Sequence, residues 1–293
     1  MRQIIRLILI CISVSPLLLA ADYRFIKIDV PNSISTEARG INARGDIVGS
    51  YTDANDVTHG FLLRNGVFTN IDVPGATATL GARGINARGD IVGNFTDGAS
   101  VQHGYLLRDG QFTQIDCPGA SASFAFGVDN AGDITGSHFD ASGNESGFIL
   151  KDGVFRNVHA PGSLSTALYG AQDNGRVWVG HAQIPPDGAF RGLVRNRPGD
   201  FQLIAFPGFP CTVARWINQR GDIVGLFPDT DNVQECSEAS THGFLLQDDQ
   251  YTQIDFPRST STRALAVNDD GGIVGLYEDR QGRTHGFKAI SND

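Results

Sequence analysis

Three arginines could together hold an anion, because they occupy one position of a sequence unit that is repeated along the chain. These are Arg39, Arg83 and Arg215, and Tyr169 fills the same position in another copy of the unit. A guanidinium presents several N–H donors in a planar fork that suits a carboxylate or a sulfate. If the repeats surround a common axis, the three side chains approach one another there.

Acidic residues offer the arginines an alternative role. In the same three copies an aspartate follows seven positions later, and a further copy has the aspartate without the arginine. Ion pairs between neighbouring units would use such partners. The sequence favours this structural role over the anion site. The aspartates are Asp46, Asp90 and Asp222.

Histidines recur in four of the units and could suggest a metal site. Each opens a His-Gly-Phe or His-Gly-Tyr segment. That segment should lie away from the axis, so histidines of different units would be too far apart to share one ion. We therefore expect each histidine to bond within its own unit and to tie a loop to a strand. They are His59, His103, His242 and His285.

Acidic residues also recur in the loops between second and third strands, where oxygen ligands could bind calcium in an exported protein. No copy has the spacing of a known calcium loop, so solvated turn residues are the expected role. The fifth unit carries a longer loop, 226–241, which we consider a candidate binding segment. The acidic loop residues are Asp53, Asp56, Asp97, Asp140, Asp229, Asp231 and Asp279, with Glu235 also in the long loop.

Local enzyme motifs are missing from the sequence. It has no Gly-x-Ser-x-Gly elbow, no His-Glu-x-x-His pair, no phosphate-binding loop and no dinucleotide fingerprint. Carboxylates contributed by separate units would leave no local motif. A hydrolase or lyase acting on an extracellular polysaccharide therefore stays open as the alternative to a non-catalytic binding module.

The elements that must position these residues come from a sixfold repeat. Each copy contains a form of Gly-Asp-Ile-Val-Gly, and the repeat has a period of forty-odd residues. Each also contains four short segments rich in Val, Ile, Phe, Tyr and Thr, separated by Gly- and Asn-containing turns. In the first copy the predicted strands are 36–42, 46–52, 59–64 and 67–73. The Gly-Asp-Ile-Val-Gly elements lie at 45–49, 89–93, 132–136, 175–180, 221–225 and 271–275.

Four antiparallel strands per unit, repeated six times, predict a six-bladed β-propeller over 22–293. The last copy ends after its third strand, and a segment of the missing fourth type stands at the other end of the chain, at about 23–30. We predict that this N-terminal strand completes the last blade and closes the ring. The strand carrying the arginines is then the innermost of each blade, and the inter-blade and long loops share one end of the ring.

The run of His-Gly-Phe segments, each preceded by Gly-Asp-Ile-Val-Gly, resembles the HAF-type repeat of probable extracellular bacterial proteins. The resemblance covers roughly 24–290. It implies export and a repeat fold, and it implies no catalytic residue. The fourth unit departs most from the pattern, with Arg191 at the place of the histidine.

The N-terminus and the charge indicate an exported protein. Segment 1–21 has two arginines, an apolar run and a small-residue end, which is the form of a cleaved signal peptide. The net charge is −9, and cleavage leaves 21 basic against 32 acidic residues, or −11. Such a surface disfavours nucleic acid and anionic lipid. We expect a secreted or periplasmic monomer that is not inserted in the membrane after cleavage and that needs no cofactor.

Cysteine usage agrees with export. Cys117, Cys211 and Cys236 remain after cleavage, without the spacing of a metal site. Cys211 and Cys236 flank one face of the fifth unit, so we predict that they form a disulfide that fixes the long loop. Cys117 is then unpaired. The function that we predict is binding of an extracellular glycan or protein at the end with the long loops.

Overall fold

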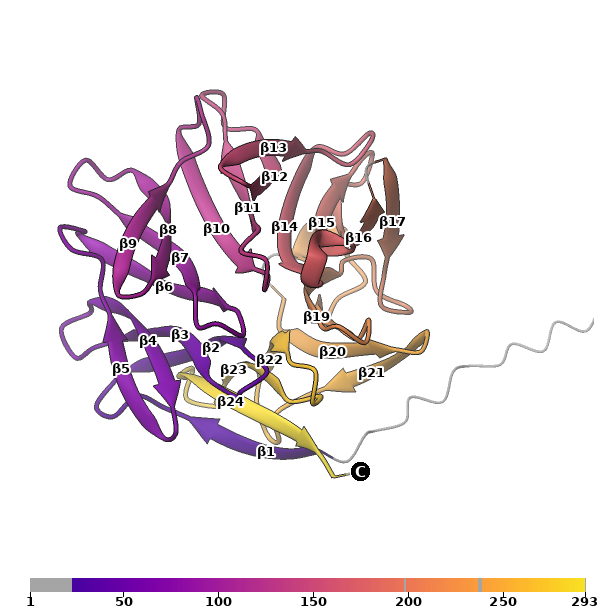
Figure 1. The fold of residues 1–293 in the computed structure, drawn as a ribbon. Coiled ribbons are helices and arrows are strands. Elements are labelled where there is room, and N and C mark those ends of the chain that lie inside the picture. Colours follow the sequence, from indigo (N-terminus) through magenta and orange to yellow (C-terminus); the bar gives the residue numbers. More distant parts are fainter. Residues whose placement is uncertain (1–22, 198, 237–238, 293) are drawn as a thin grey trace, which may run out of the picture.

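Six four-stranded antiparallel sheets surround one axis in the computed structural model, which is a six-bladed β-propeller (Figure 1). The structure describes residues 23–197, 199–236 and 239–292. The predicted signal peptide lies outside the described residues. Within them, no helix is long and apolar enough to cross a membrane.

The six blades follow one another along the chain, and in each the strands run in order from the axis to the rim. Blade 1 contains β2 (Ser35–Ile41), β3 (Ile47–Thr52), β4 (Thr58–Arg64) and β5 (Val67–Ile71). Blade 2 contains β6 (Ala78–Ile85), β7 (Ile91–Thr96), β8 (Gln102–Arg108) and β9 (Gln111–Ile115). Blade 3 contains β10 (Ala122–Val128), β11 (Ile134–Phe139), β12 (Glu145–Lys151) and β13 (Val154–Val158).

The later blades are less regular. Blade 4 contains β14 (Ser165–Ala171), the 3₁₀ turn η1 (Asp173–Gly175), β15 (Trp178–Ile184), β16 (Ala189–Arg197) and β17 (Asp200–Ile204). Blade 5 contains β18 (Val213–Ile217), β19 (Ile223–Pro228), the 3₁₀ turn η2 (Val233–Glu235), β20 (Thr241–Gln247) and β21 (Gln250–Ile254). Blade 6 contains β22 (Ser261–Val267), β23 (Ile273–Glu278), β24 (Thr284–Ser291) and β1 (Tyr23–Ile28).

The two repeated motifs fit together inside each blade. In blade 1 the final glycine of Gly-Asp-Ile-Val-Gly, Gly49, pairs across β3 and β4 with Phe61 of His-Gly-Phe. A Cβ atom at Gly49 would lie 2.7 Å from the Phe61 ring, which is fully buried. The absence of a side chain at Gly49 therefore leaves the space that the Phe61 ring occupies. This contact explains why both residues recur together in the sequence.

Ring closure occurs as the sequence predicts. Strand β1 pairs antiparallel with β24, from Tyr23 opposite Ser291 to Ile28 opposite Gly286. The Phe25 ring lies 5.7 Å from that of Phe287 and reaches the neighbouring blade at Phe256, 5.4 Å away. Figure 1 shows β1 and the C-terminal β24 side by side at the rim. The N-terminal strand thus pairs with the third strand of the last blade and gives this blade the same four strands as the others.

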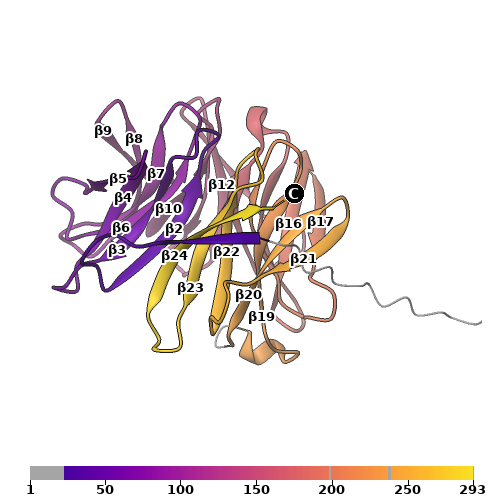
Figure 2. The same ribbon diagram turned by 90° about the horizontal axis from the view of Figure 1, so that it is seen from below.

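The ring has two distinct ends. We call the end with the inter-blade connections and the loops between second and third strands the loop end, and the end with the hairpins between first and second strands the hairpin end. Figure 2 shows the ring from the side, with η2 of the blade 5 insertion (orange) at one end and η1 (pink) at the other. The insertion, residues 229–240 between β19 and β20, belongs to the loop end.

Candidate ligand-binding site at the propeller axis

A β-bulge interrupts the innermost strand of every blade at the same level. The pairing with the second strand shifts by one residue there, for example between Ala38 and Gly40 in blade 1. A bulge inserts an extra residue and changes the direction of its side chain. The inserted residues are Arg39, Arg83, Phe126, Tyr169, Arg215 and Leu265.

These six side chains, with Trp216, line a small cavity on the axis, which we call the axial chamber. Its volume is about 20 Å³. Among the described residues that line it, three carry a positive charge and none a negative one. The structure therefore brings together the three arginines and Tyr169, as the anion-site hypothesis requires.

The arginines of the chamber differ in their partners. Arg39 pairs with the carboxylate of Glu37 and donates to Ser50 Oγ, 3.3 Å away. The Arg215 guanidinium lies over the Tyr169 ring, 3.9 Å from its centroid, in a cation–π contact. Within the described residues, the buried Nε of Arg83 has no hydrogen-bond partner. Arg83 is thus the residue best placed to donate a hydrogen bond to an incoming anion.

The charges around Arg83 are of both signs, because Arg39 and Arg215 lie near it and the carboxylate of Glu37 opposes them. Burial, together with the nearby charges of Arg39 and Arg215, lowers the pKa of Arg83 to about 9. Burial also lowers the pKa of Arg215. An anion bound beside these groups would reverse both effects, because it favours the charged form of each guanidinium.

The predicted inter-blade ion pairs of the arginines are wrong. Asp46 instead accepts hydrogen bonds from Arg44 and Arg64, at 3.3 and 3.0 Å, and the repeat places Asp90 and Asp222 in the same hairpin position. The reason is the turn that separates each pair. Asn42 and Asp46 close the hairpin opposite each other, so Asp46 lies about three residues, or about 10 Å, along the strand from the level of Arg39.

A tryptophan closes the chamber on the side of the hairpin end. The residue after the bulge is glycine in blades 1 to 4 and alanine in blade 6, but it is Trp216 in blade 5. The indole reaches across the ring, because a Cβ atom at Gly84 of blade 2 would lie 3.3 Å from it. Trp216 is buried, at 9% exposure, and packs with Ile41 and Val267. Small residues on five blades thus accommodate one indole.

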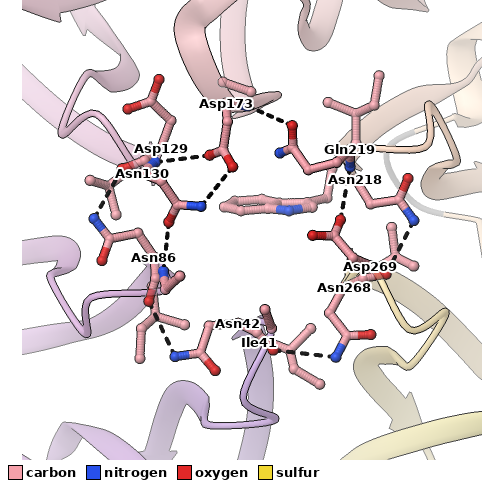
Figure 3. Close-up of a pocket in the computed structure, with 18 residues that line it drawn as sticks. Ile41, Asn42, Asn86, Asp129, Asn130, Asp173, Asn218, Gln219, Asn268 and Asp269 are labelled. Carbon is pink, nitrogen blue, oxygen red and sulfur yellow. Dashed lines mark hydrogen bonds between the residues drawn. The ribbon is translucent and has the colours of Figure 1, made fainter.

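Below the indole, a ring of carboxamides links the hairpins around a second cavity of about 50 Å³ (Figure 3). In blade 1, Asn42 Nδ2 donates to the Asn86 carbonyl of blade 2 at 3.1 Å, and Asn268 of blade 6 donates to the Asn42 carbonyl at 3.2 Å. Equivalent bonds join most blades in sequence. Their donors are Asn42, Asn86, Gln172, Asn218 and Asn268.

The carboxamide ring is interrupted at blade 3, where the position holds Asp129. Its Oδ1 accepts the amides of Gly132 and Asp133, but its buried Oδ2 lacks a partner among the described residues. Burial and the charge of Asp133 raise the pKa of Asp129. The next residue joins blades 3 and 4 instead, with Asn130 donating to the Asp173 carboxylate (Figure 3).

The four recurring histidines have a structural role, as predicted. Nδ1 of His242 lies 2.8 Å from Asp255 at the end of the fourth strand, and Nε2 lies 3.7 Å from Asp229 of the loop. The hydrogen bond to Asp255 raises the pKa of His242. His285 makes the same two contacts, with Asp29 supplied by the N-terminal segment. Each histidine therefore connects a loop of its own blade to the end of the fourth strand.

The loop aspartates also have roles within the fold. In blade 1, Asp53 Oδ1 accepts the backbone amides of Asn55 and Val57, both at 2.9 Å. These bonds lower the pKa of Asp53. Asp97, Asp140 and Asp279 make the equivalent bonds. No group of three His, Cys, Asp or Glu side chains suited to a metal ion occurs in the described ranges.

The blade 5 insertion is fixed as the sequence predicts, by a disulfide between Cys211 and Cys236. Cys117 is a free, buried thiol. Asp229, Asp231 and Glu235 are exposed on the insertion and do not line the axial chamber. Glu235 accepts a hydrogen bond from Asn232 within the loop. A binding role for these three acids stays a prediction.

Sequence reasoning missed two parts of the site. Trp216 could have been found as the single large residue at a position that is otherwise glycine or alanine. The carboxamide ring could not, because an asparagine before a turn is ordinarily explained by the turn itself. Its donation to the next blade depends on how the blades pack.

Neither a protein-family model nor a curated protein matches the sequence. Solved structures do match. Aleuria aurantia lectin in complex with alpha-methyl-L-fucoside is 12% identical, with a TM-score of 0.54, over 92% of this chain and 95% of that chain. A gluconolactonase from Xanthomonas campestris is 12% identical, with a TM-score of 0.52, over 88% of each chain. A Hadza microbial sialidase is 10% identical, with a TM-score of 0.53, over 89% of this chain and 66% of that chain. These similarities show the propeller fold.

Proposed function

We propose that this protein is an exported, non-catalytic binding module that captures an acidic extracellular glycan through the axial chamber. The observation that carries the proposal is the convergence of three arginines on one small cavity, where Arg83 has an unpartnered buried donor. Glu37 compensates part of this buried charge by pairing with Arg39, and an anion bound at Arg83 would compensate more of it. The mature net charge of −11 disfavours contact of an acidic glycan with the rest of the surface, so its binding would depend on the chamber.

The walls of the chamber favour a sugar acid as the ligand. Phe126, Tyr169 and Leu265 form its apolar side, next to the guanidinium groups. A sugar acid can present its planar carboxylate to the guanidinium groups while its ring stays outside this small cavity. We include in this proposal that the protein is secreted or periplasmic. The resemblance to the HAF-type repeat fits such a location.

Calorimetric titration with D-galacturonate tests the function, with D-galactose as the neutral control. We expect binding of the acid alone, and weaker binding at higher salt. Arg83→Met removes the charge at similar length and should weaken binding roughly 10- to 100-fold, the effect of losing a charged hydrogen bond. Arg83→Lys should retain part of the affinity, because it keeps the charge without the planar fork.

The matched control is Arg283→Met, which changes an arginine that is 66% exposed and lies outside the chamber. It should leave binding unchanged. Equal binding of galactose and galacturonate, or unchanged binding in Arg83→Met, would rule out the chamber as the site. Tighter binding of a short acidic peptide than of galacturonate would assign the ligand to proteins instead.

A hydrolase is the second candidate, and one set of contacts favours it. The Tyr169 hydroxyl lies 3.0 Å from Nδ1 of His181, whose Nε2 lies 3.7 Å from Glu145. A hydroxyl beside a base is part of a known arrangement for an activated nucleophile, although Glu145 makes no hydrogen bond to the His181 ring. Burial raises the pKa of Tyr169, however, which disfavours the phenolate. Hydrolysis of an acidic oligosaccharide that disappears in Tyr169→Phe would establish the enzyme.

A further inference from the structure

We infer that the axial chamber recognises the end of an acidic chain rather than a segment within it, an inference that rests on the proposed function. The ligand class is an oligosaccharide whose terminal residue carries a carboxylate. The inference follows from the axial chamber, which Trp216 closes on the side of the hairpin end.

The floor of the chamber prevents a chain from passing along the axis. Trp216 of blade 5 extends to Gly84 of blade 2, and blades 2 and 5 face each other across the ring. It also approaches blade 4, because a Cβ atom at Gly170 would lie 3.2 Å from the indole. A ligand can therefore enter and leave by the loop end alone.

The size of the chamber limits what enters. About 20 Å³ is room for one or two groups the size of a water molecule. A carboxylate head fits this space, but a sugar ring does not. The donors lie at the level of the bulges, below the first residues of the innermost strands, so the carboxylate must project ahead of the rest of the ligand. A terminal residue can approach in this way, since nothing continues beyond it.

The test uses oligogalacturonates attached to a surface through their reducing ends, one a trimer and one a dodecamer, at equal chain density. Binding of the protein is followed by surface plasmon resonance. Recognition of a chain end predicts the same saturation level on both surfaces, because each chain has one free end. Lateral binding predicts a severalfold higher level on the dodecamer, and this result would overturn the inference.

Calorimetry with free galacturonate separates the two hypotheses. If free galacturonate binds but neither surface does, the chamber takes a free sugar acid and not the end of a chain, which overturns this inference and leaves the chamber as the anion site. If galacturonate does not bind at all, the proposed function has failed and this inference with it. Arg83→Met should lose binding to both surfaces, whereas Arg283→Met should match the wild type on both.

Discussion

At the scale of single residues, scaffold and site are distinguished by how much a position varies among the six copies. Gly49 and Phe61 recur because one packs on the other. The bulge position varies from arginine to leucine, and its side chains line the axial chamber. Asp129 is a third case, because it stands at a position that holds a carboxamide in the other blades. It replaces an amide donor by an acid whose Oδ2 is buried without a partner among the described residues.

Asp129→Asn should stabilise the protein at neutral pH. An asparagine there can donate as Asn86 does, to the hairpin aspartate at 2.9 Å and to the next blade. Removing a buried unsatisfied group and adding a hydrogen bond should increase the free energy of unfolding by about 1–3 kcal/mol. Chemical denaturation at pH 7 measures the difference.

The gain from Asp129→Asn should depend on pH. The pKa of Asp129 is raised in the folded state, so the wild type loses stability as the pH rises from the unfolded pKa through the folded one. The advantage of asparagine is then larger at pH 7 than at pH 4. An equal or lower stability of the variant at pH 7 would contradict the role given to the carboxamide ring.

At the scale of elements, the bulged innermost strand and the blade 5 insertion determine what the ring can bind. The bulge presents a side chain to the axis without breaking the blade, because pairing resumes on either side of it. The described residues of the insertion contain the 3₁₀ turn η2, and a disulfide joins the insertion to the start of the same blade. Cys211 and Cys236 are 25 residues apart in sequence.

Cys236→Ser should destabilise the protein by about 3 kcal/mol, the value expected for releasing a loop of this length in the chain-entropy model. Guanidinium unfolding gives the difference from the wild type. A reducing agent should lower the stability of the wild type to that of the variant and leave the variant unaffected. A variant as stable as the wild type would show that the insertion is held by other contacts.

At the scale of the whole molecule, closure of the ring depends on both ends of the chain. Strand β1 is the outer strand of blade 6, and the segment that follows it contains Asp29, which contacts His285. The carboxamide ring closes at the same joint, where Asn268 of blade 6 donates to blade 1. Two separate sets of contacts therefore join the last blade to the first.

A circular permutant tests whether closure requires only the strand itself or also its position at the N-terminus. Joining residue 292 to residue 23 through an Asp-Gly turn should keep the fold, because Tyr23 already lies opposite Ser291. The new chain would begin near residue 31. We expect its melting temperature to stay close to that of the wild type. Deletion of 23–30 should abolish cooperative unfolding, and a deletion variant that melts like the wild type would contradict this account.

The sequence alone determined the sixfold repeat, the four strands per blade, the closing strand and the disulfide, because each depends on local periodicity or on residues near one another in a unit. The predicted strand 36–42 differs by one residue from the observed Ser35–Ile41. The sequence also marked Arg39, Arg83 and Arg215 as equivalent residues. It assigned them the wrong partners, since the hairpin places each aspartate about three residues along the strand from the level of its arginine.

Only the tertiary structure decided that these arginines share a cavity, that Trp216 closes it and that asparagines join the blades. Each of these facts concerns residues from different blades, which lie forty or more positions apart and meet because the ring brings them to one axis. Their contacts depend on the radius of the ring and on the bulges. The radius of the ring in particular is set by how whole blades pack on one another, which no single repeat unit encodes.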